Sequence, residues 1–378
     1  MLVLVVGGGI GGLAAATALA RNRIDATVVE ISPTNQVLGV GLNQPGNALR
    51  ALRQLGLLEE CLAAGFQYDV TRYCDAAGQV TVEVSSGLAT AGIPANSALP
   101  RPALHRILTE SAQRAGARLR AGVSVLRYVD SGEAVEVEFT DGGHERFDAV
   151  AAFDGIRSIT RGSVLGAADP EYTGFGVWRV TLPRPPEVTG SMLFQGSTTK
   201  AGLIPLGEKE MYLFHVTPEP GNPWFAPGQL LDGLRNRLVE YTGLIGSIRD
   251  GLSHADTIVY GPIEEVHLAL PWHRGRIIVL GDAAHASAPH LTQGAAMAME
   301  DAVVLADVLA HGEGTVADRL STVGSRRFPR TAFVQEVSHS ILAAEMDDGP
   351  GSAERRRHHF ATLPNRMAAL HTLLQQPA

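Results

Sequence analysis

Lysine, cysteine and long apolar runs are scarce in this 378-residue chain, and each scarcity excludes a class of protein. Lysine occurs only at positions 200 and 209, and the net charge is -8, so we expect no nucleic acid and no anionic membrane among the partners. The two cysteines, Cys61 and Cys74, are too few for a disulfide framework, which favours a reducing, cytoplasmic location. No apolar stretch reaches the ~18 residues that a membrane-spanning helix needs.

What remains has the composition of a globular, enzyme-sized protein. Hydrophobic residues make up 45% of the chain and charged residues 19%. The length permits one large or two medium domains with a sizeable core. No spacing of histidine, cysteine and carboxylate residues indicates a metal site, and no repeat of solenoid period is visible.

The first motif is a glycine-rich turn between an apolar run and a helical pattern. Residues 2–6 are apolar and rich in valine, as in a parallel strand that is buried on both faces. Gly7, Gly9 and Gly12 then satisfy GxGxxG, and Glu30 follows at the end of the next expected strand. In that order they predict a dinucleotide site, with Gly7 for the tight turn, Gly9 for backbone approach to a pyrophosphate, Gly12 for helix packing and Glu30 for ribose hydroxyls.

This motif alone leaves the cofactor open. An acid at position 30, with no arginine or lysine in residues 31–38, disfavours a 2′-phosphate, so the bound nucleotide is NAD or FAD. The alternative is a glycine-rich turn between strand and helix that binds no ligand.

Two more acids follow expected buried strands further along the chain. Asp154 comes after the strand at residues 147–153, and Asp282 comes after the strand at residues 277–280. Asp282 precedes a loop of small residues and then a helix that begins near Ala295. A carboxylate and free backbone N–H groups at one point suit a polyhydroxylated, phosphorylated cofactor. For Asp154 the alternative is a turn that leads into a helix.

The pattern predicts an α/β chain of two domains with a helical end. Residues 1–70, 101–165 and 272–310 form a discontinuous Rossmann-like cofactor domain in this interpretation. An antiparallel sheet at residues 71–100 and 166–271 is inserted into it, because strand-like pieces punctuated by proline and glycine recur there. Residues 311–378 are expected to be helical, with helices at 315–322, 326–345 and 353–376.

The three motifs together resemble those of the class A flavin-dependent aromatic hydroxylases, the para-hydroxybenzoate hydroxylase superfamily. The block from Gly281 through Asp301, with its Pro289, Gln293 and Gly294, carries most of that resemblance, which extends over residues 1–340. At the second motif the family's usual Gly-Ala before Asp154 is replaced by Ala152-Phe153.

The resemblance implies FAD as the bound cofactor and NADH or NADPH as a transient co-substrate. It implies that Gly7, Gly9, Gly12 and Glu30 hold the ADP half and that Asp282 binds ribityl and ribose hydroxyls. It also implies that Arg101 contacts FAD, that Asp154 lies near FAD and the site of NAD(P)H action, and that the isoalloxazine is lined by Pro289, Gly294 and Ala295.

The substrate is expected against the inserted sheet, where an aromatic ring needs apolar walls and one or two polar groups. Tyr212 or His215 is a candidate to orient or deprotonate a ring hydroxyl, and Arg179 is a candidate to pair with a carboxylate or phenolate. Tyr212 and Phe214 share one face of a strand and His215 lies on the other. Only one of these two faces can therefore point inward. Packing or surface roles are the alternative for each residue.

The expected activity is hydroxylation of a small aromatic or heteroaromatic compound with NAD(P)H and O2, through a C4a-hydroperoxyflavin, as the resemblance implies. We expect a monomer or homodimer. Alternatives are another flavin oxidoreductase on the same fold, such as an oxidase, dehydrogenase or halogenase, or a nucleotide-binding regulator. The Trp-x-Trp-x-Ile-Pro signature of flavin halogenases does not occur in this chain.

Overall fold

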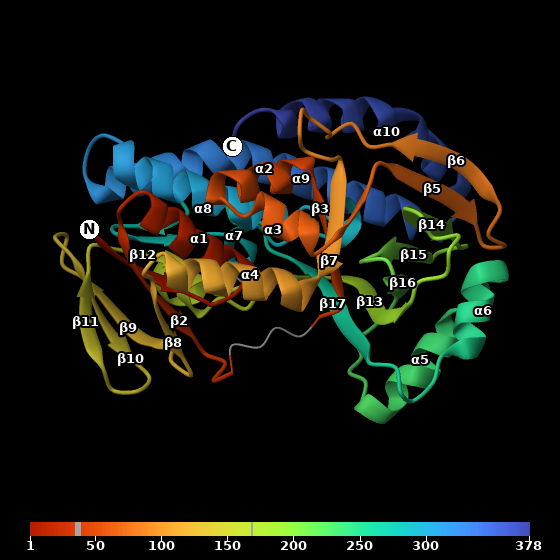
Figure 1. Cartoon of the computed structure of the whole chain (residues 1–378), viewed down its shortest axis with the longest axis horizontal. Helices are drawn as coiled ribbons and strands as arrows, with labels where there is room; N and C mark the ends of the chain where they lie inside the picture. Colours follow the sequence, from red (N-terminus) through yellow and green to blue (C-terminus); the bar gives the residue numbers. More distant parts are fainter. Residues whose placement is uncertain (35–38, 168) are drawn as a thin grey trace.

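Two large sheets and a helical layer make up the structure, which is a computed structural model that describes residues 1–34, 39–167 and 169–378 (Figure 1). The six-stranded sheet has the order β18-β19-β12-β1-β2-β8, and the seven-stranded sheet has the order β17-β13-β16-β15-β14-β5-β6. The expected architecture, a Rossmann-like unit with an inserted antiparallel sheet and C-terminal helices, is the one observed.

The six-stranded sheet is built from the apolar runs that the sequence predicts to be buried strands. It comprises β1 (Leu2–Val6), β2 (Asp25–Glu30), β8 (Arg118–Ala121), β12 (Ala149–Ala152), β18 (His273–Arg274) and β19 (Ile277–Val279). β1 pairs in parallel with both β2 and β12, and β12 pairs in parallel with β19. Parallel strands end at one edge of a sheet, so the turns after β1, β2, β12 and β19 meet there.

Helices pack close to this sheet because their contact surfaces are made of small residues. The main ones are α1 (Ile10–Arg21), α4 (Arg101–Arg114) and α8 (Gly294–His311), with α2 (Gly46–Leu55) and α3 (Leu58–Ala63) beside them. The buried face of α1 carries Ala14, Ala15, Ala16 and Ala18, which allow α8 and α4 to approach it. A small antiparallel sheet of β9 (Val125–Asp130), β10 (Val135–Phe139) and β11 (His144–Phe147) completes this part.

The seven-stranded sheet has an outer face covered by two helices and an inner face turned toward the rest of the chain. Its strands are β5 (Val70–Asp75), β6 (Val80–Ser85), β13 (Glu171–Pro183), β14 (Ser191–Gln195), β15 (Lys200–Pro205), β16 (Glu210–Pro218) and β17 (Ile258–Glu265). The outer face packs Trp178, Val180 and Leu213 against α5 (Leu230–Arg237) and α6 (Gly243–Gly251). The inner face carries the alternate residues, among them Arg179, Tyr212 and Phe214.

A second three-stranded sheet connects the two large ones. It consists of β3 (Gly41–Pro45), β7 (Asn96–Pro100) and β4 (Phe66–Tyr68), with β7 in the middle. The segment 71–100, which we assigned to the inserted sheet, is therefore divided. β5 joins the seven-stranded sheet by pairing in parallel with β14, whereas β7 pairs with β3 and β4.

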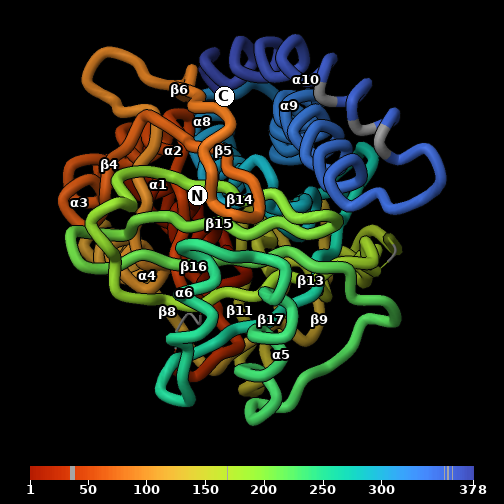
Figure 2. The backbone as a smooth tube through the Cα atoms, turned by 90° about the vertical axis from the view of Figure 1, so that its right-hand side faces the viewer, coloured from red at the N-terminus to blue at the C-terminus, as the bar shows by residue number. Residues whose placement is uncertain are grey.

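The C-terminal region forms two long helices, α9 (Val316–Glu345) and α10 (Ser352–Gln375). The expected break between residues 322 and 326 is wrong, since α9 continues through it and through Pro329. Buried residues on both sides of the expected break, Val323 and Arg327, hold the helix together by tertiary packing. Figure 2 shows α9 and α10 beside the strands β14 and β5. Within the described residues, no helix is long and apolar enough to cross a membrane.

Candidate functional site

The turn after β1 forms a backbone cradle, and a different steric constraint applies at each of its motif glycines. Gly7 has a φ of +104°, and a Cβ there would lie 2.4 Å from the carbonyl oxygen of Phe153. A Cβ on Gly12 would lie 1.9 Å from the carbonyl oxygen of Gly7, so α1 can approach the strand only without a side chain. A Cβ on Gly9 would meet nothing within 4 Å, so Gly9 faces open space at the start of α1. This is the arrangement that a pyrophosphate requires.

Glu30 closes the same turn. One carboxylate oxygen accepts a hydrogen bond from the Gly8 N–H at 2.7 Å, and the other accepts one from the Ser32 N–H at 2.8 Å. His105 of α4 contacts the loop from the other side, with its Nε2 2.8 Å from the Gly8 carbonyl oxygen. A carboxylate oxygen can accept more than one hydrogen bond, so Glu30 retains acceptor capacity for ribose hydroxyls.

The loop after β19, residues 281–295, supplies a second set of donors and acceptors and is named the cofactor loop here. It begins at Gly281, which has a φ of +61°, and passes through α7 (Asp282–His285) and η3 (Pro289–Leu291). The Asp282 side chain is exposed and has no hydrogen-bond or ionic partner among the described residues. A Cβ on Gly294, where the 18-residue α8 begins, would lie 3.8 Å from Asp282 Oδ1. The carboxylate therefore stands beside the free N–H groups of Gly294 and Ala295.

Two other predicted cofactor residues are placed differently. Asp154 uses both carboxylate oxygens inside its own loop, accepting from the Ser158 hydroxyl at 2.6 Å and from the Thr160 N–H at 3.0 Å. That arrangement makes it a structural residue of the turn after β12. Arg101 is the first residue of α4, and its guanidinium is exposed and has no ionic partner among the described residues.

A buried network beneath the cofactor loop holds its first half. Asp301 of α8 accepts hydrogen bonds from the Gly281 N–H at 2.9 Å and from Arg327 Nε at 2.7 Å, and it lies 2.6 Å from His285 Nε2. Burial alone would raise the pKa of Asp301, but His285 and Arg327 outweigh it and lower that pKa to about 2. Asp301 is therefore a charged anchor for the turn that presents Asp282.

The second half of the loop is held by amides. The side chains of Asn47 and Gln293 donate to each other at 2.9 and 3.1 Å, and Asn47 also donates to Glu300 at 3.0 Å. Arg327 and Arg330 of α9 lie 2.9 and 2.8 Å from Glu300 Oε2. We did not predict Asn47, Arg327 or Arg330 as supporting residues, because they come from elements far apart in the chain. Their polar character at buried helix positions was the only available signal.

On the inner face of the seven-stranded sheet, Arg179 is half-buried and has no acceptor among the described side chains and carbonyls. It pairs across the strands with Phe214, which in turn pairs with Gly202. A Cβ on Gly202 would lie 2.2 Å from the Phe214 ring, so the absence of a side chain lets that ring lie flat on the sheet. Burial lowers the pKa of Arg179, and the nearby phenol of Tyr212 opposes that shift.

Tyr212 lies on the same face in an apolar cluster with Val40, Ile204 and Leu206. Burial raises its pKa to about 12, against the opposing effect of Arg179, so the phenol stays protonated at neutral pH. Tyr68 of β4 belongs to the same cluster, and burial, then Tyr212, raises its pKa. Tyr68 was not predicted, because nothing in its local sequence separates it from a packing residue.

His215 is on the outer face and does not join Arg179 and Tyr212. Its ring nitrogens lie 3.3 Å from the Lys200 carbonyl and 3.0 Å from the Arg237 carbonyl, and its ring packs edge-on against Tyr241. Burial lowers its pKa to about 4. The prediction that His215 is catalytic therefore has no support in the geometry, since alternation along β16 directs it away from the cofactor loop.

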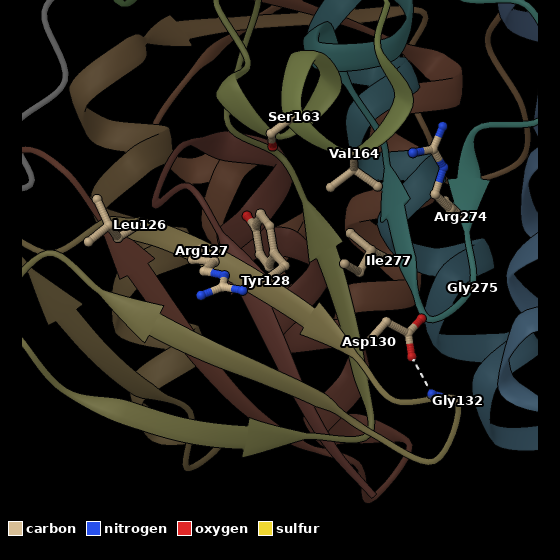
Figure 3. A pocket seen from close by; sticks show the side chains of 10 residues that line it. All are labelled: Leu126, Arg127, Tyr128, Asp130, Gly132, Ser163, Val164, Arg274, Gly275 and Ile277. Atoms are coloured by element: carbon tan, nitrogen blue, oxygen red, sulfur yellow. Dashed lines mark hydrogen bonds between the residues drawn. The ribbon is translucent and has the colours of Figure 1, made fainter.

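A surface pocket of the molecule lies elsewhere (Figure 3). It has a volume of about 660 Å³ and lies between β9, the π-helical turn η1 (Arg161–Leu165) and the β18–β19 turn. Arg127 and Arg274 line it, together with Ile277. Ile277 is the first residue of β19, whereas Asp282 follows the last, so the pocket is at the opposite end of the strand from the cofactor loop.

A family model described as an FAD binding domain matches residues 1–337. The chain belongs to this FAD-binding domain family. The residues described above suit the cofactor: a cradle open at Gly9, an acid at the end of β2 and, at a helix start, the Asp282 carboxylate, which has no partner among the described residues. FAD is therefore the cofactor of this protein.

Relatives with this FAD-binding domain match nearly the whole chain. A Bacillus subtilis (strain 168) protein, provisionally named as the FAD-dependent monooxygenase YetM, is 33% identical, and the match covers 96% of this chain and 98% of the relative. The 2-heptyl-3-hydroxy-4(1H)-quinolone synthase of Pseudomonas aeruginosa (strain UCBPP-PA14) is 29% identical, over 97% and 95%. The 6-hydroxynicotinate 3-monooxygenase of Bordetella bronchiseptica is 26% identical, over 92% and 93%.

Solved structures share the fold at lower identity. Klebsiella pneumoniae HpxO in complex with FAD and uric acid matches with a TM-score of 0.87 and 22% identity, over 99% of this chain and 96% of that one. A substrate complex of salicylate hydroxylase matches with a TM-score of 0.81 and 20% identity, over 100% and 98%. Both solved structures therefore share the overall fold of this chain.

Proposed function

We propose that this protein is an FAD-dependent monooxygenase that uses NAD(P)H and O2 to hydroxylate a small aromatic or heteroaromatic compound. The observation that carries the proposal is that Arg179 has no acceptor among the described residues and lies beside Tyr212, in an apolar wall on the inner face of the seven-stranded sheet, which is named the substrate sheet here. A half-buried guanidinium that no protein group pairs is available to a ligand with an acceptor oxygen, and the bond is strongest where that ligand excludes water.

In this proposal the cofactor is held from two distant parts of the chain. Gly7, Gly9, Gly12 and Glu30 bind its ADP half, while Asp282 and the backbone at Gly294 and Ala295 bind its flavin half. Pro289 and Arg101 border the flavin. When bound, FAD supplies the redox chemistry and oxygen activation, and the protein supplies binding, orientation and water exclusion. Asp154 supports the site by holding its own turn.

Arg179 and Tyr212 orient the substrate in this proposal. Arg179 pairs with an anionic or electron-rich oxygen of the ring, and Tyr212 donates a hydrogen bond, because its pKa of about 12 keeps the phenol protonated. Val40, Ile204 and Leu206 keep water away from the ring. We leave His215 out, since it faces the outer helices.

The named activities of the relatives support a ring substrate. A quinolone and hydroxynicotinate are both heteroaromatic, and the structural neighbour HpxO was solved with uric acid. These names belong to those proteins, and they suggest the panel for this one. A cytoplasmic location, a monomeric or homodimeric state and the use of either NADH or NADPH remain expectations.

An oxidase or dehydrogenase on the same fold is the competing activity. The test is NADH and NADPH oxidation by the FAD-loaded protein with phenols, hydroxybenzoates, hydroxypyridines, quinolones and purines. A monooxygenase shows a rate that rises with one ring compound and a hydroxylated product. A rate that no compound changes, with hydrogen peroxide as the only product, would support an oxidase instead.

A further inference from the structure

A buried polar cluster connects the substrate sheet, the cofactor loop and the C-terminal helix. Lys200 of β15 places its Nζ 2.8 and 3.0 Å from the two carboxylate oxygens of Glu345, the last residue of α9. His290, the middle residue of η3, has its Nε2 3.5 Å from Glu345 Oε2. The side chains of Lys200, Glu345 and His290 are 8%, 6% and 1% exposed.

The cluster lies on the inner face of the sheet, two residues along β15 from Gly202. Lys200 pairs with Val216, which packs against Ala288 of the cofactor loop and against Leu342 and Met346 near the end of α9. The polar cluster is thus surrounded by the apolar contacts between the sheet, loop and helix. Arg179, Phe214 and Gly202 are paired across three neighbouring strands, and Lys200 and Val216 form the next pair on the same face. The polar cluster therefore lies next to Arg179 and Phe214 but does not include them.

His290 is unusual within this cluster. Both of its ring nitrogens are buried and make no hydrogen bond among the described residues, so the 3.5 Å approach to Glu345 is their nearest ionic interaction. Burial, and then the positive charge of Lys200, hold the pKa of His290 well below its usual range. The ring is therefore neutral at physiological pH, even though a carboxylate lies next to it.

The rest of the cofactor loop is fixed by other contacts. The N–H of Ala288 donates to Glu265 of β17 at 3.1 Å, and Gln293 is paired with Asn47 of α2. Between them, His290 approaches Glu345 at the end of α9, and Glu345 in turn pairs with Lys200 of the sheet. Breaking a buried ion pair by removing one partner is strongly destabilising, whereas apolar replacement of the whole pair often is not. A buried pair at this point is therefore better explained by a role in position and charge than by stability.

We propose that the Lys200–Glu345 ion pair and His290 form a positioning cluster that fixes the middle of the cofactor loop to both the substrate sheet and the C-terminal helix. Lys200 pairs with Glu345, and burial together with the positive charge of Lys200 keeps the His290 ring uncharged at this loop. The inference rests on the proposed function only in placing the flavin at this loop. His290 and Lys200 are positioning residues, because neither is shown to touch cofactor or substrate.

The charged and titratable groups around the cluster come from four elements. Lys200 is on β15, His290 on η3 and Glu345 on α9, and His359 of α10 is influenced by the charge of Glu345. Arg366 and His358 of α10 act on His359 in turn. Lys200 is thus the cation in direct contact with Glu345, and its removal leaves the carboxylate to the two histidines.

The test is a set of charge variants on the FAD-loaded protein: Lys200→Met, Glu345→Gln, their double variant, and Lys200→Arg as the conservative change. The His290 ring signals are followed by NMR between pH 5 and 8 and assigned from their loss in His290→Gln. The FAD dissociation constant is measured in parallel. Lys209→Met, which alters the exposed second lysine, is the matched control.

We expect the wild-type His290 ring to stay neutral across this range. In Lys200→Met it gains a proton within the range, because Glu345 then has no cation, and FAD affinity falls about 10-fold. Glu345→Gln keeps the ring neutral but also weakens FAD, and the double variant recovers part of the affinity. Lys200→Arg and Lys209→Met resemble the wild type.

If Lys200→Met weakens FAD binding but leaves the His290 titration unchanged, the cluster contributes only general packing and the proposal is overturned. No change in either measurement would overturn it as well. If Lys200→Met does not fold, Glu345→Gln decides, since wild-type FAD affinity in that variant would contradict a positioning role. A wild-type protein that never binds FAD would refute the proposed function instead, and the His290 titration could still be measured on that protein.

Discussion

The ring of Phe153 lies against Gly11. A Cβ on Gly11 would come within 2.6 Å of Phe153 Cδ1 and within 3.1 Å of the Ala298 Cβ. Phe153 stands where the resembling family usually has a small residue, directly before Asp154. The extra glycine inside the GxGxxG turn therefore accommodates the bulk that precedes the second acidic turn.

Gly11→Ala should thus destabilise the protein by about 1–3 kcal/mol through overpacking. The loss of unfolding free energy in the double variant with Phe153→Leu should be smaller than the sum of the losses in the two single variants. The smaller leucine leaves room for the alanine Cβ, and that Cβ fills part of the space that the phenylalanine ring occupied. Urea unfolding of the two single variants and the double variant measures this coupling. Strictly additive costs would mean that the two residues do not compensate each other.

Asp282→Ala should weaken FAD binding by about 10-fold or more, the loss expected for a charged hydrogen bond. The unfolding free energy of the FAD-free protein should stay the same, since Asp282 has no partner to lose among the described residues. Flavin titration and urea unfolding give the two values. Asp307→Ala, at an exposed acid of α8, is the control and should leave FAD affinity unchanged. Unchanged FAD affinity in Asp282→Ala would remove this residue from the site.

Two tyrosines on opposite sides of the substrate sheet separate function from stability. Tyr212→Phe removes an inner-face hydroxyl and should lower kcat/KM about 10-fold, while the unfolding free energy changes by less than about 0.5 kcal/mol. Tyr241→Phe removes an outer hydroxyl that lies 2.7 Å from Thr199 Oγ1, and it should cost about 1 kcal/mol of stability with normal kcat/KM. The opposite pattern would reverse our assignment of the two faces.

Arg327→Met should cost about 3–5 kcal/mol, because it leaves Asp301 and Glu300 buried with less compensation. In the wild type the pKa of Asp301 is about 2, below its unfolded value of about 3.9, so its stabilisation is complete above the unfolded value and is lost as pH falls toward 2. In the variant His285 alone still opposes the effect of burial, so the pKa of Asp301 should rise and that loss should begin at higher pH.

Unfolding free energies between pH 2 and 7 measure this shift. Arg326→Met is the neighbouring control, because Arg326 makes an exposed ion pair with Asp307 and should cost less than about 1 kcal/mol at any of these pH values. Equal pH profiles for Arg327→Met and the wild type would contradict the role of Asp301 as a charged anchor.

The geometry of the candidate cofactor site could be predicted where it is local, while the binding role of its residues stays a prediction. Gly7, Gly12 and Glu30 lie within one strand-helix-strand unit, and Asp282 follows a strand directly, so spacing and strand pattern were enough. The inserted sheet was also readable from alternation, which correctly separated Tyr212 from His215. Alternation shows that a strand has two faces, but it does not show which face is the inner one. That assignment requires the folded chain, in which α5 and α6 cover the outer face.

The supporting residues could not be predicted because they meet only in the folded chain. Asn47, Gln293 and Arg330 come from α2, the cofactor loop and α9, and Lys200 and Glu345 are separated by 145 residues. The length of α9 was missed for the same reason. Gly324 and Pro329 weaken a helix locally, whereas the burial of Val323 and Arg327 decides the outcome.

The most direct measurement of the central claim is the origin of the oxygen atom in the product. The FAD-loaded protein is incubated with NADH or NADPH, the ring compounds named above and ¹⁸O2, and the products are analysed by mass spectrometry. The account predicts one compound that accelerates NAD(P)H oxidation and gains a single ¹⁸O atom. Hydrogen peroxide as the only product with every compound, or a purified protein that does not bind FAD, would contradict it.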